Sequence, residues 1–482
     1  MARFLMIDCY MKKTLLFLFL SFSVALTAQQ ITLKKGIIID NIPVKDSLAE
    51  SFALYLPTSF DITKKWPIVF VYDMQGRGKQ VISMFRQAAE KQGYILAASN
   101  NVNDSLTLSK NVLISSRMFN AAYSIIPIKK DRSYTAGFAA GARMASLVPT
   151  FVKEIQGVIA CGSPVANEEV LSIKNRFHFI GVVGSEDYNY PAMLNSQKVL
   201  NKLKFPNQLL VFEGGQEWPE SGYLSKAMEI FTLAAMAKGI ESKDDTLINS
   251  SYQKNLGEVS TLLSEKKPLL ANKLLVEMTS IYRNYKNIDS LRENSKTLRK
   301  TKLYKAQNRG QNAAFLKEEF IKDEYTYLLE EDVFTYNYNN LGWWKYQMDE
   351  LAKYEKGVSF FEKQMGRRLK GYVNALIADN IDVIKASTPV DEEALTFLWM
   401  VNTITDASNS KPYLKVISNS SRVEDYGTAL FYLEELLKNG YTDKKELYSL
   451  EHTAILRLTP EFNELVAKYL KEARYDIVPD ED

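Results

Sequence analysis

Two glycines that flank an alanine occupy the place where a nucleophile could stand. Gly137, Ala139 and Gly141 follow a predicted short strand at residues 133–136 and precede a predicted helix at residues 140–148. A strand that passes through a Gly-x-Ser-x-Gly turn into a helix presents its serine at a sharp turn. The glycines fit such a turn, because it is too tight for side chains on its flanks. Ala139 has no oxygen that could attack a carbonyl group.

A second position of chemical interest lies downstream, in residues 212–219. The sequence Phe-Glu-Gly-Gly-Gln-Glu-Trp-Pro has the form of a loop that carries a catalytic histidine, but Gln216 stands in the histidine's place. Glutamine does not titrate, so it cannot accept a proton as a general base. Two of the three positions of a nucleophile–base–acid triad, the nucleophile and the base, are therefore predicted to lack a reactive side chain.

The elements around these positions alternate between strand and helix signals from residue 29 to about residue 239. The continuous apolar run at residues 66–72 is typical of a buried central strand. Other strand signals lie at residues 52–56, 94–98, 157–161, 177–183 and 208–212. This order predicts an α/β fold, with a mostly parallel sheet covered by helices on both faces.

After Gly239 the strand signals end and apolar residues recur at three- and four-residue steps, as on one face of a helix. The pattern predicts an all-α domain at residues 241–482, an array of helical hairpins with a degenerate tetratricopeptide-like period. The polar residues 241–245 predict the boundary with the first domain, residues 29–240. Helical arrays offer extended surfaces for recognition, so we expect a protein or peptide partner on this half.

Five ordered segments of the first half resemble the α/β-hydrolase superfamily, and more closely its secreted esterase-like branch, which is related to polyhydroxybutyrate depolymerases and feruloyl esterases. The resemblance covers roughly residues 54–236. The segments that carry it are residues 67–73, 97–101, 134–145, 184–190 and 214–219.

The resemblance implies a role for each residue of the site. Asp187 matches the acid that orients the histidine base, whereas Ala139 and Gln216 depart from the nucleophile and the base. Phe138 and Ala140 complete the turn. The resemblance also implies an oxyanion hole, formed by the backbone N–H of Ala140 and one from the loop of Asp73, Met74 and Gln75. Such a hole could bind a carbonyl group without cleaving an ester.

Few residues could replace the missing nucleophile and base. The only histidines are His178 and His452. His178 is expected at the start of a strand, which is the end of the sheet away from the turn, and His452 lies in the helical half. Cys161 ends a predicted strand without a histidine nearby, so we expect it to be buried and unreactive. We predict no cofactor and no metal site.

The net charge bears on nucleic-acid binding, and the first residues bear on the cellular location. The formal net charge is +3 in 482 residues, which excludes a strongly basic nucleic-acid surface. Two lysines and a short apolar run predict a signal peptide that ends at Ala28, with Met11 as the true start. We therefore expect a secreted or periplasmic protein that has no transmembrane helix after cleavage.

These observations favour a pseudoenzyme that acts as a binding or scaffolding protein in the cell envelope. Two alternatives stay open at this stage. One is an active esterase for ester-linked carbohydrates or polyesters that uses a non-standard nucleophile. The other is a carbohydrate or polyester binder that holds a small molecule or glycan in the vestigial pocket.

Overall fold

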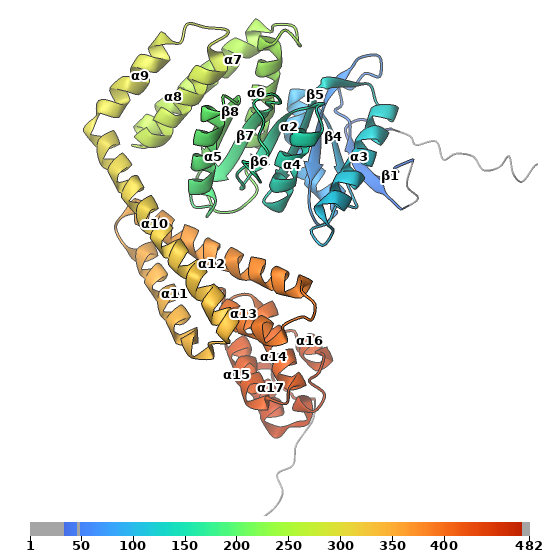
Figure 1. Cartoon of the computed structure of the whole chain (residues 1–482), viewed down its shortest axis with the longest axis vertical. Helices are drawn as coiled ribbons and strands as arrows, with labels where there is room; N and C mark the ends of the chain where they lie inside the picture. The colour runs from blue at the N-terminus through green and yellow to red at the C-terminus, as the bar shows by residue number, and fades with distance from the viewer. Residues whose placement is uncertain (1–32, 46–48, 475–482) are drawn as a thin grey trace, which may run out of the picture.

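The structure is a computed structural model that describes residues 33–45 and 49–474 (Figure 1). The predicted signal peptide and the alternative start at Met11 lie outside these residues. An α/β part comes first in the chain, and an all-helical part follows it. No helix of the described residues is long and apolar enough to cross a membrane.

The α/β part is built on one sheet of eight strands in the order β1-β2-β4-β3-β5-β6-β7-β8. The pairs β1–β2 and β2–β4 are antiparallel, and all pairs from β4 to β8 are parallel. The strands are β1 (Ile38–Pro43), β2 (Ser51–Tyr55), β3 (Trp66–Tyr72), β4 (Ile95–Ser99), β5 (Ile128–Phe138), β6 (Ile155–Cys161), β7 (His178–Gly184) and β8 (Asn207–Phe212).

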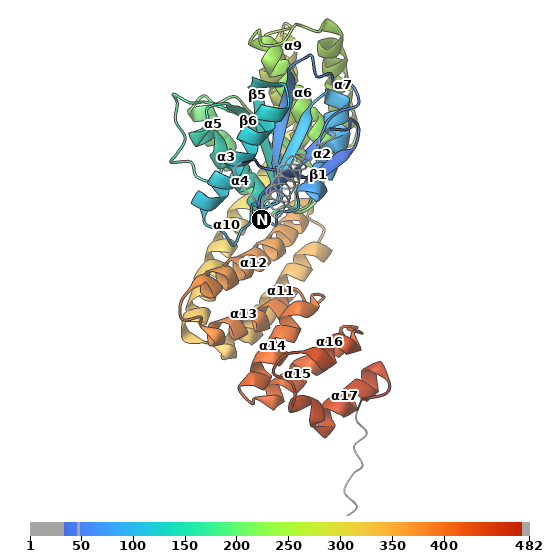
Figure 2. The ribbon, with the colours of Figure 1, turned by 90° about the vertical axis from the view of Figure 1, so that its right-hand side faces the viewer.

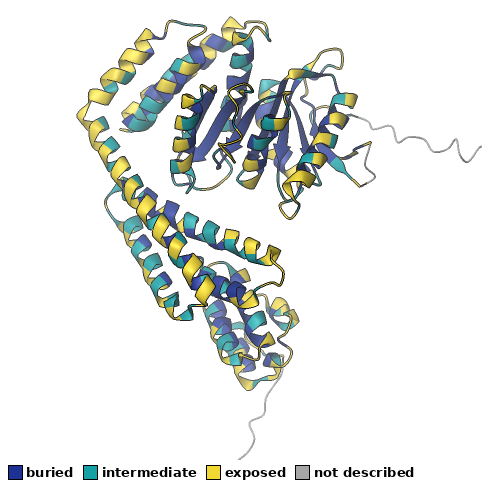
Figure 3. Cartoon of the chain, viewed as in Figure 1, coloured by how far each residue is buried: buried dark blue, intermediate teal, exposed yellow. Residues whose placement is uncertain are grey.

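Helices cover both faces of this sheet, and its inner strands are almost entirely buried, whereas the edge strand β1 is largely exposed or half-buried (Figure 3). One face packs against α2 (Gly78–Gln92) and α6 (Ser221–Ala237), the other against α3 (Leu108–Ile125), α4 (Ala140–Phe151) and α5 (Tyr190–Lys202). The predicted fold class is confirmed. Continuous apolar runs form the inner strands because both of their faces are covered.

The core of the first face continues into the helical part. Helices α7 (Asp245–Ser264), α8 (Pro268–Tyr282) and α9 (Asp289–Lys300) add Ile248, Met278 and Leu291 to the cluster that contains Phe231 of α6. Helix α8 also covers the edge strand β8, where the backbone N–H of Leu209 donates to Glu277 Oε1 at 3.2 Å. The first helices after α6 therefore complete a core that the sheet begins.

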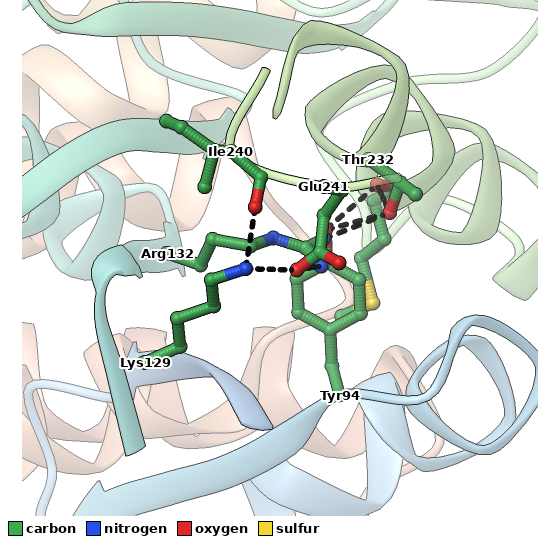
Figure 4. A network of polar contacts seen from close by, with 7 residues as sticks. Tyr94, Lys129, Arg132, Thr232, Ile240 and Glu241 are labelled. Carbon is green, nitrogen blue, oxygen red and sulfur yellow. Dashed lines mark hydrogen bonds and ion pairs between the residues drawn. The ribbon is translucent and has the colours of Figure 1, made fainter. Parts of the chain in front are cut away.

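A polar network fixes the connection between α6 and α7 (Figure 4). Glu241 forms ion pairs with Arg132 at 2.8 Å and with Lys129 at 2.9 Å, both on β5. The buried Arg132 also donates to Tyr94 at 2.7 Å and to Thr232 at 3.1 Å. The charged segment after residue 240 is thus anchored to the sheet, although the domain boundary at this point stays a prediction.

The remaining helices form two further cores (Figure 2). Trp344 lies fully buried, beside Tyr325, in the core that comes first along the chain. Helices α10 and α12 have 34 and 27 residues, so the hairpins are unequal in length. The helices are α10 (Lys302–Thr335), α11 (Leu341–Lys356), α12 (Phe360–Ala386), α13 (Glu392–Thr405), α14 (Ser410–Arg422), α15 (Tyr426–Lys438), α16 (Lys444–Ser449) and α17 (Pro460–Leu470). The likeness to tetratricopeptide repeats stays a prediction.

Candidate functional site

Ala139 lies at the turn between β5 and α4 and has an unusual backbone. Its φ is 48° and its ψ is −117°, a conformation that residues with a side chain rarely adopt. The backbone N–H of Ala139 donates to the carbonyl oxygen of Cys161 at 2.9 Å, and its own carbonyl accepts from Arg143 at 3.0 Å. Such strain persists only where the surrounding structure holds it.

The glycines on either side let this turn pack directly on the sheet. A Cβ atom on Gly137 would lie 2.3 Å from the carbonyl carbon of Gly141, and one on Gly141 would lie 2.3 Å from the carbonyl oxygen of Tyr72. These contacts are with backbone, which cannot move aside as a flexible side chain would. The turn therefore requires glycine at both positions.

Asp187 lies in the loop after β7, close to the turn. Its side chain is 1% exposed, and Oδ1 accepts from the backbone N–H of Asn189 at 2.8 Å. A Cβ atom on Gly162 would lie 3.0 Å from Asp187 Oδ2 and 3.0 Å from the ring of Phe138, which places the carboxyl group beside the turn. Burial raises the pKa of Asp187 to about 7, although the Asn189 N–H and nearby Lys322 act in the opposite direction.

Gln216 lies in the loop after β8, which is bound to the Asp187 loop. The backbone N–H of Glu186 donates to the carbonyl oxygen of Gly214 at 2.9 Å. The exposed Gln216 side chain donates through Nε2 to the hydroxyl of Tyr188 at 2.8 Å, so its partner is the neighbour of Asp187. Trp218 of the same loop packs against Phe138, with ring centroids 5.0 Å apart.

The loop expected to complete the oxyanion hole is largely occupied by its own contacts. The N–H of Gln75 donates to Asp73 Oδ1 at 3.0 Å, and Arg77 pairs with Asp73 Oδ2 at 2.8 Å. A donor from Asp73, Met74 or Gln75 to an oxyanion hole stays a prediction. Ala140 is the first residue of α4, where backbone N–H groups have no acceptor within the helix.

The groups that could replace the missing chemistry are held elsewhere. Thr135 Oγ1 donates to the carbonyl oxygen of Ala145 at 2.8 Å, and burial strongly raises the pKa of the Cys161 thiol. His178 lies at the start of β7, at the opposite end of the sheet from the turn, and contacts Gln208 Oε1 at 2.5 Å. His452 lies between α16 and α17. No group of three or more metal-binding side chains occurs in the described residues.

Helices α10 and α12 attach to the Asp187 loop through a buried ion pair that sequence reasoning missed. Arg368 of α12 pairs with Glu318 of α10 at 2.7 Å, and both side chains are 2% exposed or less. Arg368 also donates to the carbonyl oxygen of Ser185 at 2.8 Å. Lys322 of α10 donates to the carbonyl oxygen of Tyr188 at 2.9 Å. The backbone on both sides of Asp187 is thus held by the helical part.

Two more side chains of α12 reinforce this attachment. Gln364 donates to the Ser185 hydroxyl at 3.0 Å, and Arg367 forms a partly exposed ion pair with Glu186. Gly371 lies so close to the Tyr188 ring that a Cβ atom would approach it to 3.3 Å. The adjacent arginines Arg367 and Arg368 are the only sequence signal for this contact, and they do not identify a partner.

Five cavities of the described residues have volumes of about 450–790 Å³. None of the five is lined by Ala139, Asp187 or Gln216. The region around the turn therefore supplies a strained backbone, a buried acid and a neutral amide, without one of these cavities above them.

No protein-family model matches the chain, and no curated protein matches it. Among solved structures, it is similar to S-formylglutathione hydrolase from Staphylococcus aureus, with 10% identity and a TM-score of 0.33 over 42% of this chain and 98% of that one. It is also similar to Est1E from Butyrivibrio proteoclasticus, with 12% identity and a TM-score of 0.32 over 42% of this chain and 99% of that one.

A third similar structure is esterase B from Lactobacillus rhamnosis, with 13% identity and a TM-score of 0.35 over 48% of this chain and 99% of that one. A dipeptidyl aminopeptidase IV structure from Bacteroides ovatus shares 15% identity, with a TM-score of 0.33 over 41% of this chain. The chain spans 34% of the length of that structure. The N-terminal part is an eight-stranded, mostly parallel sheet covered by helices, and an all-helical part follows it.

Proposed function

We propose that the protein is an exported, catalytically impaired α/β-hydrolase-like protein that acts by binding or scaffolding in the cell envelope. The observation that carries this proposal is Ala139. Its backbone has the strained conformation of a nucleophile turn, but its side chain has no reactive atom. Gln216 cannot act as a base, and Asp187 has no imidazole to orient.

The attachment of α10 and α12 supports a structural use of the same loops. Enzymes commonly need mobile loops beside the reacting groups. Here the loop that bears Asp187 is bound to the helical part through the buried Arg368 and Glu318. An α/β domain that serves as a platform for helices needs this rigidity, whereas it does not need a nucleophile. The proposed partner surface lies on the helical part.

Hydrolysis of p-nitrophenyl and feruloyl esters tests the proposal directly. We expect the purified chain without its signal peptide to hydrolyse these esters no faster than buffer alone. Turnover that a serine-directed fluorophosphonate inhibits would overturn the proposal, and would favour the active hydrolase with a non-standard nucleophile.

A repair experiment tests the assignment of the site. The double variant Ala139→Ser with Gln216→His should gain weak esterase activity, and each single variant should gain much less, because nucleophile and base act as a unit. Ala139→Ser alone is the matched control, since it adds the hydroxyl without the base. A folded double variant that stays inert on a broad ester panel would show that Gln216 does not occupy the position of the base.

A further inference from the structure

A cavity of about 730 Å³ lies at the amino ends of β7 and β8, opposite the end of the sheet that bears Ala139. The ends of α5, α6 and α8 surround it. Because α8 belongs to the helical part, the cavity exists only where both parts of the chain meet. Its volume is within the usual range for small-molecule sites.

Four cationic side chains line this cavity, and no carboxylate does. Arg176, Lys204, Lys238 and Arg283 are all exposed, and none forms an ion pair with another residue of the described chain. Like charges around one cavity repel one another. The overall charge of the chain is nearly balanced, so this concentration is local.

Helix ends account for only part of the positive charge. Lys238 and Arg283 directly follow α6 and α8, and Lys204 follows α5 by two residues. A cation stabilises a helix C-terminus, which carries roughly half of a negative charge. Three such ends offset about one and a half charges, fewer than the four cations supply. Arg176 is at no helix end, since it precedes β7.

The floor of the cavity is neutral and already ordered. His178 contacts Gln208 Oε1 at 2.5 Å, and the Gln208 amide donates to Ser280 at 3.3 Å. Asn207 donates to Asn201 at 2.8 Å. Burial lowers the pKa of His178 to about 4, so its ring adds no charge near neutral pH. Apolar contact comes from Phe205, Ile230, Leu233 and Ile281.

We propose that this cavity binds a small organic polyanion, a molecule whose carbon skeleton carries two or more phosphate, sulfate or carboxylate groups. The four separated cations match several negative groups better than one, and the guanidinium groups can each bind an oxyanion through two N–H donors. The apolar side chains of the lining suit the carbon skeleton. A ligand held there contacts β7, β8 and α8 together, so it would stabilise the junction of the two parts.

Calorimetric titration of the chain without its signal peptide tests this proposal. The probes are fructose 1,6-bisphosphate, citrate and pyrophosphate, with fructose as the neutral match of the first. We expect fructose 1,6-bisphosphate or citrate to bind at low ionic strength more tightly than pyrophosphate, fructose not to bind, and added salt to weaken the binding. The preferred probe identifies the oxyanion and shows whether a carbon skeleton is required.

Charge removal at the cavity provides the matched variants. Lys204→Asn, Lys238→Gln and Arg283→Gln together should weaken anion binding by about tenfold or more. Asparagine suits position 204, where φ is 60°. Lys202→Gln removes an exposed lysine of α5 that does not line the cavity, and should leave binding unchanged.

Circular dichroism and thermal unfolding verify that both variants fold. Absence of binding for both organic anions would overturn the proposal, whether or not pyrophosphate binds. Binding of fructose as strong as that of its bisphosphate would do so too, as would equal losses in the cavity and control variants. A loss confined to the cavity variant supports it.

Discussion

The two ends of the parallel sheet differ in how the protein uses its polar side chains. At the carboxyl end, Ala139 keeps a strained turn, while Asp187 is buried and Gln216 is bound to Tyr188. At the amino end, four cations surround an open cavity without ion pairs in the described residues. The carboxyl end combines a strained turn with a buried carboxyl group, and positions 139 and 216 hold an alanine and a glutamine. The amino end has four cations that form no ion pair among the described residues.

This difference teaches that polar side chains at the two ends of one sheet can have different uses. The charges at the carboxyl end hold parts of the chain together, as Arg368 and Glu318 do. Those at the amino end remain free for a ligand. Variants at the carboxyl end should therefore change stability, and variants at the amino end should change binding.

The largest expected effect comes from Arg368→Met. This variant leaves the buried Glu318 with Lys322, at 2.8 Å, as its remaining ion-pair partner. We therefore expect a cost of about 3–4 kcal/mol, the lower half of the range for loss of one partner of a buried pair. Urea unfolding measures the change in the free energy of unfolding. Arg367→Met is the matched control, because the neighbouring Arg367 is half exposed and its pair should contribute at most about 1 kcal/mol. Equal effects of the two variants would contradict the attachment described above.

Asp187→Asn should give a pH-dependent effect of the next size. The pKa of Asp187 rises from 3.8 to about 7 on burial, so the folded state binds more protons than the unfolded chain between these values. The free energy of unfolding of the natural protein therefore falls as pH rises through this window. Asparagine cannot ionise, and its oxygen can still accept from Asn189.

Urea unfolding at two pH values measures this effect. The variant should match the natural protein near pH 4 and exceed its stability near pH 8 by on the order of 2–4 kcal/mol. The control Asp131→Asn changes an exposed carboxylate and should shift stability by less than about 0.5 kcal/mol at both pH values. A pH-independent effect of Asp187→Asn would refute the raised pKa.

Gly141→Ala should destabilise the turn by about 1–3 kcal/mol, because the new methyl group meets the Tyr72 backbone. Gly257→Ala is the control in α7, where a Cβ atom meets nothing within 4 Å. That change should instead stabilise the protein by about 0.5–1 kcal/mol. Thermal unfolding would show whether each variant is less or more stable than the natural protein. A harmless Gly141→Ala would mean that the turn is less tightly packed than its distances indicate.

The fold class could be predicted because its signals are local in sequence. The run at residues 66–72 forms β3, and the glycines around Ala139 form the predicted strand-to-helix turn. The absence of a nucleophile at Ala139 and of a base at Gln216 could be predicted for the same reason. An alanine or a glutamine lacks the required group in any fold.

Contacts between distant segments could not be predicted. Arg368 and Glu318 lie on different helices, and the sequence around each of them does not predict its contact with the other. The bond between Gln216 and Tyr188 depends on the rotamers of two loops. The raised pKa of Asp187 is a property of its surroundings, which the sequence around it does not contain. The cationic cavity likewise combines residues from five separate elements.

The cover that α8 gives to β8 has a consequence for synthesis of the chain. A nascent chain that has reached residue 240 still exposes the outer edge of β8 and the apolar side of α6 where Ile248 and Met278 later pack. An open strand edge readily pairs with another chain. The α/β segment should therefore need protection from self-association until residues 245–282 follow, and a gene truncated at residue 240 should yield aggregated material.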